Sequence, residues 1–306
     1  MNTGKRKNTM RISGNDRVYL AVVYTFIGLF SMAVIYPLIY VVSASFSSPE
    51  ALIQGRVFFL PVEPGLKGYA AVFRNNAVWQ GYFNSIVYTV SGTAISVFLT
   101  MLGGFVLSRK EFPLRIPVML FFTITMFFSG GLVPSYLLLT NLHMLNTIWA
   151  LILPGAFSVW FSVIVRTFIQ STVPEELFEA TSLDGGNYFD YLFRIVWPLS
   201  VPVMAVMALS FAAGHWNSYF SAMIYLNDTK LYPLQLILRS ILIENSLDFT
   251  STSTLMLDVR DSLERQYLSE LLKYSLIIVS SVPLLVVYPF LQKYFIKGIM
   301  VGSLKG

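Results

Sequence analysis

The sequence predicts an all-α membrane protein that crosses a bilayer with six helices. Hydrophobic residues make up 55% of the 306 residues and charged residues only 12%, compared with ~25% charged residues in soluble proteins. The charged residues are also unevenly distributed, and long runs of the chain contain none. No Asp, Glu, Lys or Arg occurs in residues 18–49, 75–108, 116–165, 195–227 or 274–292. These runs are long enough for spanning helices, which need about 20 apolar residues each.

Five charge-free runs predict six helices because run 116–165 is long enough for two spans. Gly130, Gly131, Pro134 and the polar stretch 141–147 supply the turn between those two spans. We therefore expect one transmembrane domain, residues 18–296, between an N-terminal segment 1–17 and a C-terminal tail 297–306. The expected helices lie near residues 18–45, 80–107, 117–139, 147–169, 199–223 and 271–296.

Lysine and arginine placement predicts the orientation of these helices. Thirteen of the 21 basic residues lie in segment 1–17, in the connector after the second helix, beside the connector after the fourth, or near the C-terminus. The positive-inside rule places these parts and both termini in the cytoplasm, and connectors 47–79 and 224–270 outside. The basic excess indicates topology and contact with anionic membrane lipid. It does not indicate nucleic-acid binding, since no basic patch is interleaved with aromatic residues.

The composition also argues against several kinds of chemistry. The chain has no cysteine, and its two histidines, His143 and His215, are far apart in sequence, so we expect no metal site. The phosphate-binding pattern Gly-x-x-x-x-Gly-Lys-Ser/Thr is missing. Apart from Arg166, Lys273 and Lys293 close to their ends, the expected spans hold no acid or base except His215, which argues against an ion-coupled transporter and an intramembrane enzyme. A cleavable signal peptide ending at residues 43–45 is the alternative for the first helix, but its apolar stretch is too long for one.

The connector 172–198, between the fourth and fifth helices, is unusually polar and acidic. Thr172 and Glu175 have capping-box spacing, with Pro174 in the first turn, which predicts a helix from Thr172 to Leu183. Tandem glycines after Asp184 would end that helix, and a second helix from Asn187 would stop before Pro198. The connector carries five carboxylates, those of Glu175, Glu176, Glu179, Asp184 and Asp190.

This helical hairpin is expected to dock onto another protein. Its first helix carries the apolar residues Leu177, Phe178 and Ala180, which we expect no other part of the chain to cover. A capped helix, a glycine hinge and a returning helix would form a rigid projection on the cytoplasmic side.

The hairpin resembles the cytoplasmic loop signature of bacterial ABC importer permeases, in which Glu-Ala-Ala is followed by Gly, Ile and Pro. Two positions depart from that pattern, Thr181 and Gly186, and both keep the side chain small. Stretches 128–137, 146–151, 214–220 and 292–306 resemble the carbohydrate-uptake branch, similar to maltose-type and polysaccharide-fragment permeases, and the likeness covers roughly residues 17–306. The matching signature positions are Glu179, Ala180, Gly185, Ile195, Pro198 and Pro202.

The resemblance implies an importer-type permease bundle in the bacterial cytoplasmic (inner) membrane. It implies a second, different permease as heterodimer partner, two copies of an ABC ATPase that hold ATP and Mg, and an external solute-binding protein that contacts loop 224–270. This chain would then be no enzyme, and its cargo would be a carbohydrate, in particular an oligosaccharide. The residues implied in ATPase coupling are Glu175, Glu176, Glu179, Ala180, Asp184, Gly185 and Gly186.

Two other functions fit the residues alone: a self-sufficient facilitator or channel for small polar solutes, and a membrane scaffold or receptor without a pore. In the facilitator, the hairpin would be only an amphipathic interfacial element. An ATPase that co-purifies would favour the importer over both alternatives.

The outer end of the fifth helix offers candidates for the substrate path. Trp216, Asn217 and Tyr219 combine aromatic faces with an amide, which suits sugars. The alternative is structural, since Trp and Tyr are common at membrane interfaces and Asn can hydrogen-bond a neighbouring helix. Neighbours on a helix diverge by ~100° per residue, so the three cannot all face one lumen, and Asn217 is the expected contact. Gly103 and Gly104 are explained by close helix packing.

Overall fold

The computed structural model describes residues 14–251 and 272–289 of the chain. All regular structure in this part of the chain is helical. The chain divides into two units, one with residues up to Ala70 together with 255–278, and one with residues 71–254 and 279 onward. Most of the predicted segment 1–17, the tail 297–306 and residues 252–270 of the predicted external loop lie outside the described residues.

The first unit contains one long apolar helix and an ordered connector. It holds α1 (Gly14–Phe46), α2 (Pro49–Ile53), the start of α3 (Lys67–Arg74) and the beginning of the helix Leu272–Pro289. Serine hydroxyls fold the connector back after α1. The Ser43 hydroxyl donates to the Phe59 carbonyl at 2.6 Å, and the Ser47 hydroxyl accepts from the Val62 amide at 3.1 Å.

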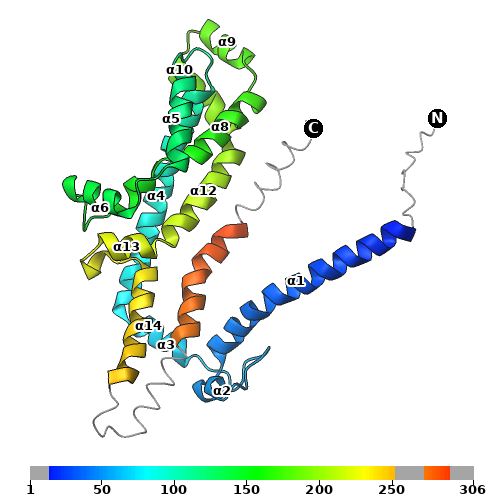
Figure 1. The fold of residues 1–306 in the computed structure, drawn as a ribbon, viewed down its shortest axis with the longest axis vertical. Helices are drawn as coiled ribbons and strands as arrows, with labels where there is room; N and C mark the ends of the chain where they lie inside the picture. The colour runs from blue at the N-terminus through cyan, green and yellow to red at the C-terminus, as the bar shows by residue number, and fades with distance from the viewer. Residues whose placement is uncertain (1–13, 252–271, 290–306) are drawn as a thin grey trace. The chain divides into compact units, whose positions relative to one another are not determined.

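The second unit contains the other helices, arranged along α4 (Figure 1). The hairpin helices lie at one end of α4, and α14 lies at the other end. The elements are α4 (Asn76–Ser108), α5 (Arg115–Phe127), α6 (Leu132–Asn141), α7 (Trp149–Ile152), η1 (Leu153–Gly155), α8 (Val159–Thr172), α9 (Glu176–Leu183), α10 (Tyr188–Tyr191), the π-helical turn η2 (Leu192–Val196), α11 (Trp197–Leu199), α12 (Val201–Trp216), α13 (Tyr219–Tyr225), η3 (Thr229–Leu231) and α14 (Leu234–Ser251).

Glycines let three helices approach α4 closely. A Cβ at Gly81 would lie 2.6 Å from the Ile237 side chain of α14, and one at Gly92 would lie 2.6 Å from the His215 ring of α12. A Cβ at Gly104 would lie 2.5 Å from Val165 in α8. Small residues therefore set these helix contacts, as the sequence predicts for Gly104.

Three of the six expected helices are not continuous. Within the described residues, three helices are long and apolar enough to span a membrane: Asp16–Phe46, Asn76–Ser108 and Leu272–Pro289. The number reaches six only if each of three bent pairs counts as one span. The bent pairs are Arg115–Phe127 with Leu132–Asn141 at 115°, Trp149–Gly155 with Val159–Thr172 at 48°, and Tyr188–Leu199 with Val201–Trp216 at 78°.

The continuous helices predicted for 117–139, 147–169 and 199–223 are therefore wrong in detail. Gly131 takes a φ of +82° between α5 and α6, a conformation that favours glycine. Pro154 lies in the tight turn η1, and a turn at Asn217 separates α12 from α13. Hydropathy counts apolar residues and does not detect these turns.

Polar residues of α4 fix the loop that precedes α14. The Asn84 amide donates to the carbonyls of Lys230 at 2.7 Å and Tyr232 at 3.0 Å. The Tyr88 hydroxyl donates to the Leu231 carbonyl at 2.7 Å, and the Leu234 amide donates to the Ser85 hydroxyl at 2.8 Å. These bonds hold the described start of the predicted external loop 224–270 against α4.

Candidate functional site: the acidic hairpin and a polar cavity

The first hairpin helix, α9, begins at Glu176 and not at Thr172, so the predicted start and its capping box are wrong. Thr172 is the last residue of α8. Val173 then takes an extended backbone, φ −101° and ψ 110°, because the following Pro174 disfavours helical angles at the residue before it. Glu176 and Glu179 lie in the first turn of α9, where carboxylates interact favourably with the helix dipole.

The turn of the hairpin lies where the tandem glycines predict it. Gly185 has a φ of +79°, a left-handed conformation that glycine adopts without strain. A Cβ at Gly186 would lie 2.7 Å from the Thr181 side chain, so this position also needs glycine. A capping box closes the turn, with the Asn187 side chain accepting the Asp190 amide at 3.1 Å and Asp190 accepting the Asn187 amide at 3.2 Å.

The second hairpin helix runs from Tyr188 to Leu199, so the predicted end before Pro198 is wrong. The turn η2 ahead of the proline has π-helical hydrogen bonding. A wider turn of this kind relieves the clash between a proline ring and the carbonyl four residues earlier. The bend to α12 follows at Ser200.

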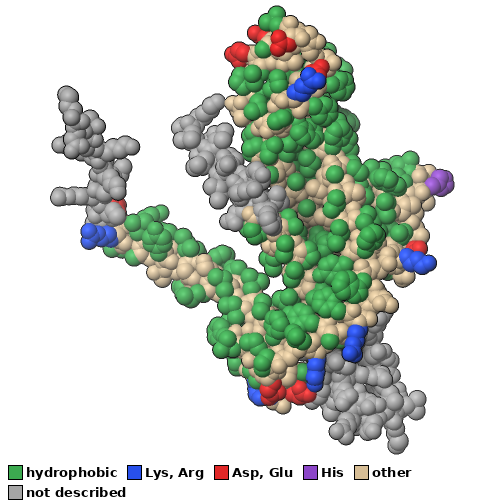
Figure 2. Space-filling view, turned by 180° about the vertical axis from the view of Figure 1, so that it is seen from behind, with side chains coloured by type: hydrophobic (Ala, Val, Ile, Leu, Met, Phe, Trp, Pro, Cys, Tyr) green, Lys and Arg blue, Asp and Glu red, His purple; other side chains and the backbone are tan. Residues whose placement is uncertain are grey.

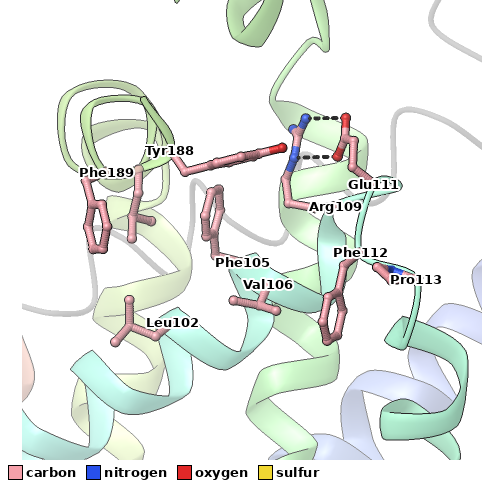
Figure 3. Close-up of a pocket in the computed structure, with 10 residues that line it drawn as sticks. Leu102, Phe105, Val106, Arg109, Glu111, Phe112, Pro113, Tyr188 and Phe189 are labelled. Carbon is pink, nitrogen blue, oxygen red and sulfur yellow. Dashed lines mark hydrogen bonds and ion pairs between the residues drawn. The ribbon is translucent and has the colours of Figure 1, made fainter. Parts of the chain in front are cut away.

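Arg109, the residue after α4, fixes the hairpin to that helix. Its guanidinium is buried, donates to both carboxylate oxygens of Glu111 at 2.9 and 3.2 Å, and lies 4.0 Å from the centre of the Phe178 ring. Tyr188 stacks on Phe178 with ring centres 5.1 Å apart, and the Arg109 guanidinium also lies 5.3 Å from the Tyr191 ring. Figure 3 shows the Arg109–Glu111 pair beside Tyr188.

Other parts of this chain therefore cover two of the three apolar residues that we expected to find uncovered. Phe178 contacts Arg109, and Leu177 packs against the core cluster formed by α4, α8, α12 and the second hairpin helix. Ala180 is exposed. The prediction that nothing in the chain covers this face is wrong for Leu177 and Phe178.

Electrostatics strengthen the same junction. The Lys110 ammonium forms an ion pair with Glu175 at 2.5 Å. Burial acts to raise the pKa of Glu111, but its backbone hydrogen bond and the Arg109 guanidinium hold that pKa below its ordinary value. Arg109 and Lys110 at the end of α4 thus pair with two carboxylates, Glu111 in the connector to α5 and Glu175 just before α9.

The tip of the hairpin is open to a partner. Leu183 is 89% exposed, and acidic side chains gather at the end of the molecule where α9 lies (Figure 2). Of the residues predicted for ATPase coupling, Gly186 is partly buried and the others are exposed: Glu175, Glu176, Glu179, Ala180, Asp184 and Gly185. The structure therefore brings these residues to one surface, and their role in coupling stays a prediction.

An apolar cavity of about 500 Å³ lies below the hairpin (Figure 3). Leu102, Phe105 and Val106 of α4 form one wall, and Tyr188 and Phe189 of α10 form another. The Arg109–Glu111 pair borders it on the hairpin side.

A second cavity, of about 410 Å³, lies at the other end of α12, and it receives one of the three predicted substrate-path residues. Asn217 borders it together with Ser210, His215 and Ser218, and the Asn217 amide also donates to the Ala213 carbonyl at 2.9 Å. The wall thus offers an amide, an imidazole and hydroxyls, the groups that hydrogen-bond a sugar.

The other two predicted substrate-path residues are held by the protein. Trp216 is only 3% exposed, and its indole donates to the Ser280 carbonyl at 2.9 Å. The Tyr219 ring lies below the Arg239 guanidinium at 4.8 Å. A substrate contact for any of the three residues, including Asn217, stays a prediction.

Comparison with known proteins shows relatives along almost the whole chain. It is 35% identical over 291 residues to the polygalacturonan/rhamnogalacturonan transport system permease protein YtcP of Bacillus subtilis, covering 95% of this chain and 99% of the relative. It is 35% identical over 299 residues to Protein LplC of the same organism, covering 98% of this chain and 99% of the relative. The chain belongs to the carbohydrate ABC transporter permeases. No protein-family model matches it.

A solved structure agrees with this family. The permease superposes on a chain of a bacterial ABC transporter involved in the import of the acidic polysaccharide alginate, with a TM-score of 0.83 and 30% sequence identity. The match covers 94% of this chain and 100% of that chain. The fold is therefore that of an ABC importer permease.

Sequence patterns do not indicate that Arg109 and Lys110 of this permease contact the hairpin segment. Both follow directly after the charge-free run 75–108 and precede Glu111, a position that by itself predicts only topology. The contact between Arg109 and Phe178 joins residues far apart in the sequence, and no local pattern indicates it.

Proposed function

We propose that this chain is the permease subunit of an ATP-driven importer for an oligosaccharide, and that hairpin 172–198 couples it to two ABC ATPase subunits. One observation carries the proposal: the hairpin has an exposed acidic tip and a base that Arg109 and Lys110 attach to α4. A projection that is free at its tip and fixed at its base suits the transfer of a movement from a bound partner.

The attachment suggests how ATP binding in the partner subunits would act on this chain. Closure of the two ATPases, which would hold ATP and Mg, displaces α9. Phe178 lies on α9 and contacts the buried Arg109, so the displacement reaches the inner end of α4. Because α8, α12 and α14 contact α4 at Gly104, Gly92 and Gly81, α4 moves with its neighbours, and the bundle alternates between inward-open and outward-open states.

The cargo that fits best is an oligosaccharide with acidic sugars. Polygalacturonan in the name of YtcP and alginate in the description of the solved importer are both uronic acid polymers. The charge-free runs of this chain contain no Asp or Glu that would repel such a cargo in the membrane. The cavity at Asn217 offers neutral hydrogen-bonding groups, with His215 and Ser218 beside it.

The remaining parts of the proposal concern assembly and orientation. A second permease of different sequence would complete the pore, and an external solute-binding protein would contact loop 224–270. Both termini and the hairpin would face the cytoplasm of a bacterial cell, because the basic residues favour that side.

Two substitutions at the hairpin tip test coupling. We expect Glu179→Ala and Gly185→Asp to lower substrate-stimulated ATP hydrolysis by the assembled complex about 30-fold, since a central interface residue contributes about 2 kcal/mol. Glu50→Ala is the matched control, because Glu50 is an exposed carboxylate in α2, outside the hairpin. Membrane insertion should be unchanged in all three variants.

Normal coupled hydrolysis and uptake in both tip variants would remove the coupling role. Uptake by the isolated chain without an ATPase would instead indicate a facilitator. Stimulation by neutral but not by uronate-containing oligosaccharides would contradict the proposed cargo and leave the coupling role intact.

A further inference from the structure

A third cavity, of about 560 Å³, is lined by an unusual concentration of basic side chains. It lies between the end of α4, the start of α5 and the end of α8. Among the described residues on its wall, Glu175 is the one carboxylate. The basic residues on the wall are Arg109, Lys110, Arg115 and Arg166.

Two of these four positive charges are neutralised within the chain. Arg109 pairs with Glu111, and Lys110 pairs with Glu175. Arg115 and Arg166 are partly buried, and their guanidinium groups have no ion pair or hydrogen-bonding partner among the residues that the structure describes. Partly buried charge without a counter-charge is unfavourable. The cavity therefore attracts negative charge.

The positions of Arg115 and Arg166 place this cavity at the membrane boundary. The two residues flank the charge-free run 116–165, one directly before it and one directly after it. Beyond Arg115, α5 presents exposed apolar side chains along its length, at Ile116, Leu120 and Ile124. A positively charged cavity thus opens beside an uncovered apolar helix face.

We propose that this cavity binds an anionic phospholipid, with its phosphate between the guanidinium groups of Arg115 and Arg166 and its acyl chains along α5. Guanidinium groups bind phosphate oxygens in a bidentate manner, which favours arginine in such a site. Basic pockets between membrane helices are suited to anionic headgroups. An acidic protein segment would satisfy the charges but would leave the apolar face of α5 uncovered.

This site lies beyond the proposed coupling function but touches the same structural junction. Thr172, Val173 and Glu175, which begin the hairpin segment, line the cavity with Arg115 and Arg166. A lipid bound there contacts the base of the hairpin, so membrane composition would alter how firmly the hairpin is held.

Native mass spectrometry can measure the lipid bound to the full-length chain, purified with its associated subunits in mixed phosphatidylglycerol and phosphatidylcholine. The wild-type protein should retain phosphatidylglycerol in preference to phosphatidylcholine. The double variant Arg115→Gln/Arg166→Gln should lose that preference, by about 5-fold for each charge removed. The double variant Lys67→Gln/Arg74→Gln is the matched control, since it removes two exposed basic residues from α3 and should bind as the wild type does.

Several results would overturn the proposal. Equal retention of the two lipids by the wild type would do so without any variant, as would unchanged phosphatidylglycerol retention in the Gln double variant. Displacement of phosphatidylglycerol by millimolar inorganic phosphate would show that the site takes free phosphate. Loss of a co-purifying ATPase with lipid retention intact would show that the two arginines face a protein. If the Gln variant does not fold, Arg115→Lys/Arg166→Lys should show a smaller loss of preference, because it keeps the charge without the bidentate geometry.

Discussion

Arg109 is the residue whose loss should most weaken the attachment of the hairpin. In Arg109→Gln, the guanidinium no longer lies 4.0 Å from the Phe178 ring or pairs with Glu111. A desolvated cation–π contact is worth about 1–2 kcal/mol. The pair with Glu111 adds at most about 1 kcal/mol, because the Glu111 side chain is 44% exposed. We therefore expect a loss of about 2 kcal/mol, with Phe178 contributing the larger share.

Hydrogen exchange of the α9 and α10 amides measures this attachment directly, since exchange reports local opening. A loss of 2 kcal/mol should speed exchange there about 30-fold and leave α14 unaffected. Lys110→Gln is the matched control. Its partner Glu175 and Lys110 itself are 45% and 68% exposed, and such a surface pair is worth only about 0–1 kcal/mol. Its effect should therefore stay below about 5-fold.

A double-mutant cycle separates the ring contact from the ion pair. Arg109→Gln and Phe178→Leu should be non-additive by about 1 kcal/mol, because each removes the same cation–π contact. Unchanged exchange in Arg109→Gln, or strict additivity with Phe178→Leu, would refute the view that this contact attaches the hairpin.

Three further predictions concern helix packing, pH and the cavity at Asn217. Gly104→Val should lower stability by about 1–3 kcal/mol through overpacking, since a Cβ at Gly104 would lie 3.0 Å from the Ser162 carbonyl. Gly28→Val is the control, because a Cβ at Gly28 would have nothing within 4 Å, and it should be near neutral. A thermal unfolding assay in detergent measures both variants. The folded structure lowers the pKa of Glu111 from its ordinary value of 4.5. Ionised Glu111 therefore stabilises the folded chain at pH values above 4.5, and this stabilisation is lost as the pH falls through the folded-state pKa. The difference in melting temperature between wild type and Glu111→Gln should thus be constant from pH 8 to 6 and shrink below pH ~4.5; a constant difference down to pH ~3 would contradict it. Asn217→Leu should reduce uptake with assembly and basal ATP hydrolysis preserved, and normal uptake would make Asn217 a packing residue.

The sequence predicted the long helices well because their signal is local. The expected spans 18–45 and 80–107 correspond to α1, Gly14–Phe46, and α4, Asn76–Ser108. Both come from charge-free runs longer than a bilayer needs. The glycine turn of the hairpin was equally predictable, because Gly185 requires only its own backbone angles.

The errors arose where one residue type allows two local structures. Thr172 and Glu175 satisfy capping-box spacing, but α8 continues through Thr172 and the true capping box forms at Asn187 and Asp190. Pro198 is a common helix terminator, yet the π-helical turn before it lets the helix continue to Leu199. Tertiary packing decides between such alternatives, and a single sequence does not contain it.

The candidate site required distances that sequence patterns do not supply. The acidic tip could be predicted because its residues are neighbours in the chain, whereas its attachment joins Arg109 to Phe178. That contact joins the end of α4 to the hairpin, which hydropathy alone does not indicate. At 33 residues, α4 is about 50 Å long, longer than the ~30 Å core of a bilayer.

Each end of α4 contacts a polar segment of the permease: the hairpin at one end and the start of loop 224–270 at the other. Arg109 binds the hairpin directly after its last residue, and Asn84 binds the carbonyls of Lys230 and Tyr232 near its first. Between these ends, the helix is unbroken and contains no proline. If ATPase closure moves the hairpin, the same helix moves the start of loop 224–270, where an external binding protein would deliver its cargo. An unbroken α4 therefore gives the proposed importer a direct mechanical connection between ATP hydrolysis on one side of the membrane and cargo release on the other.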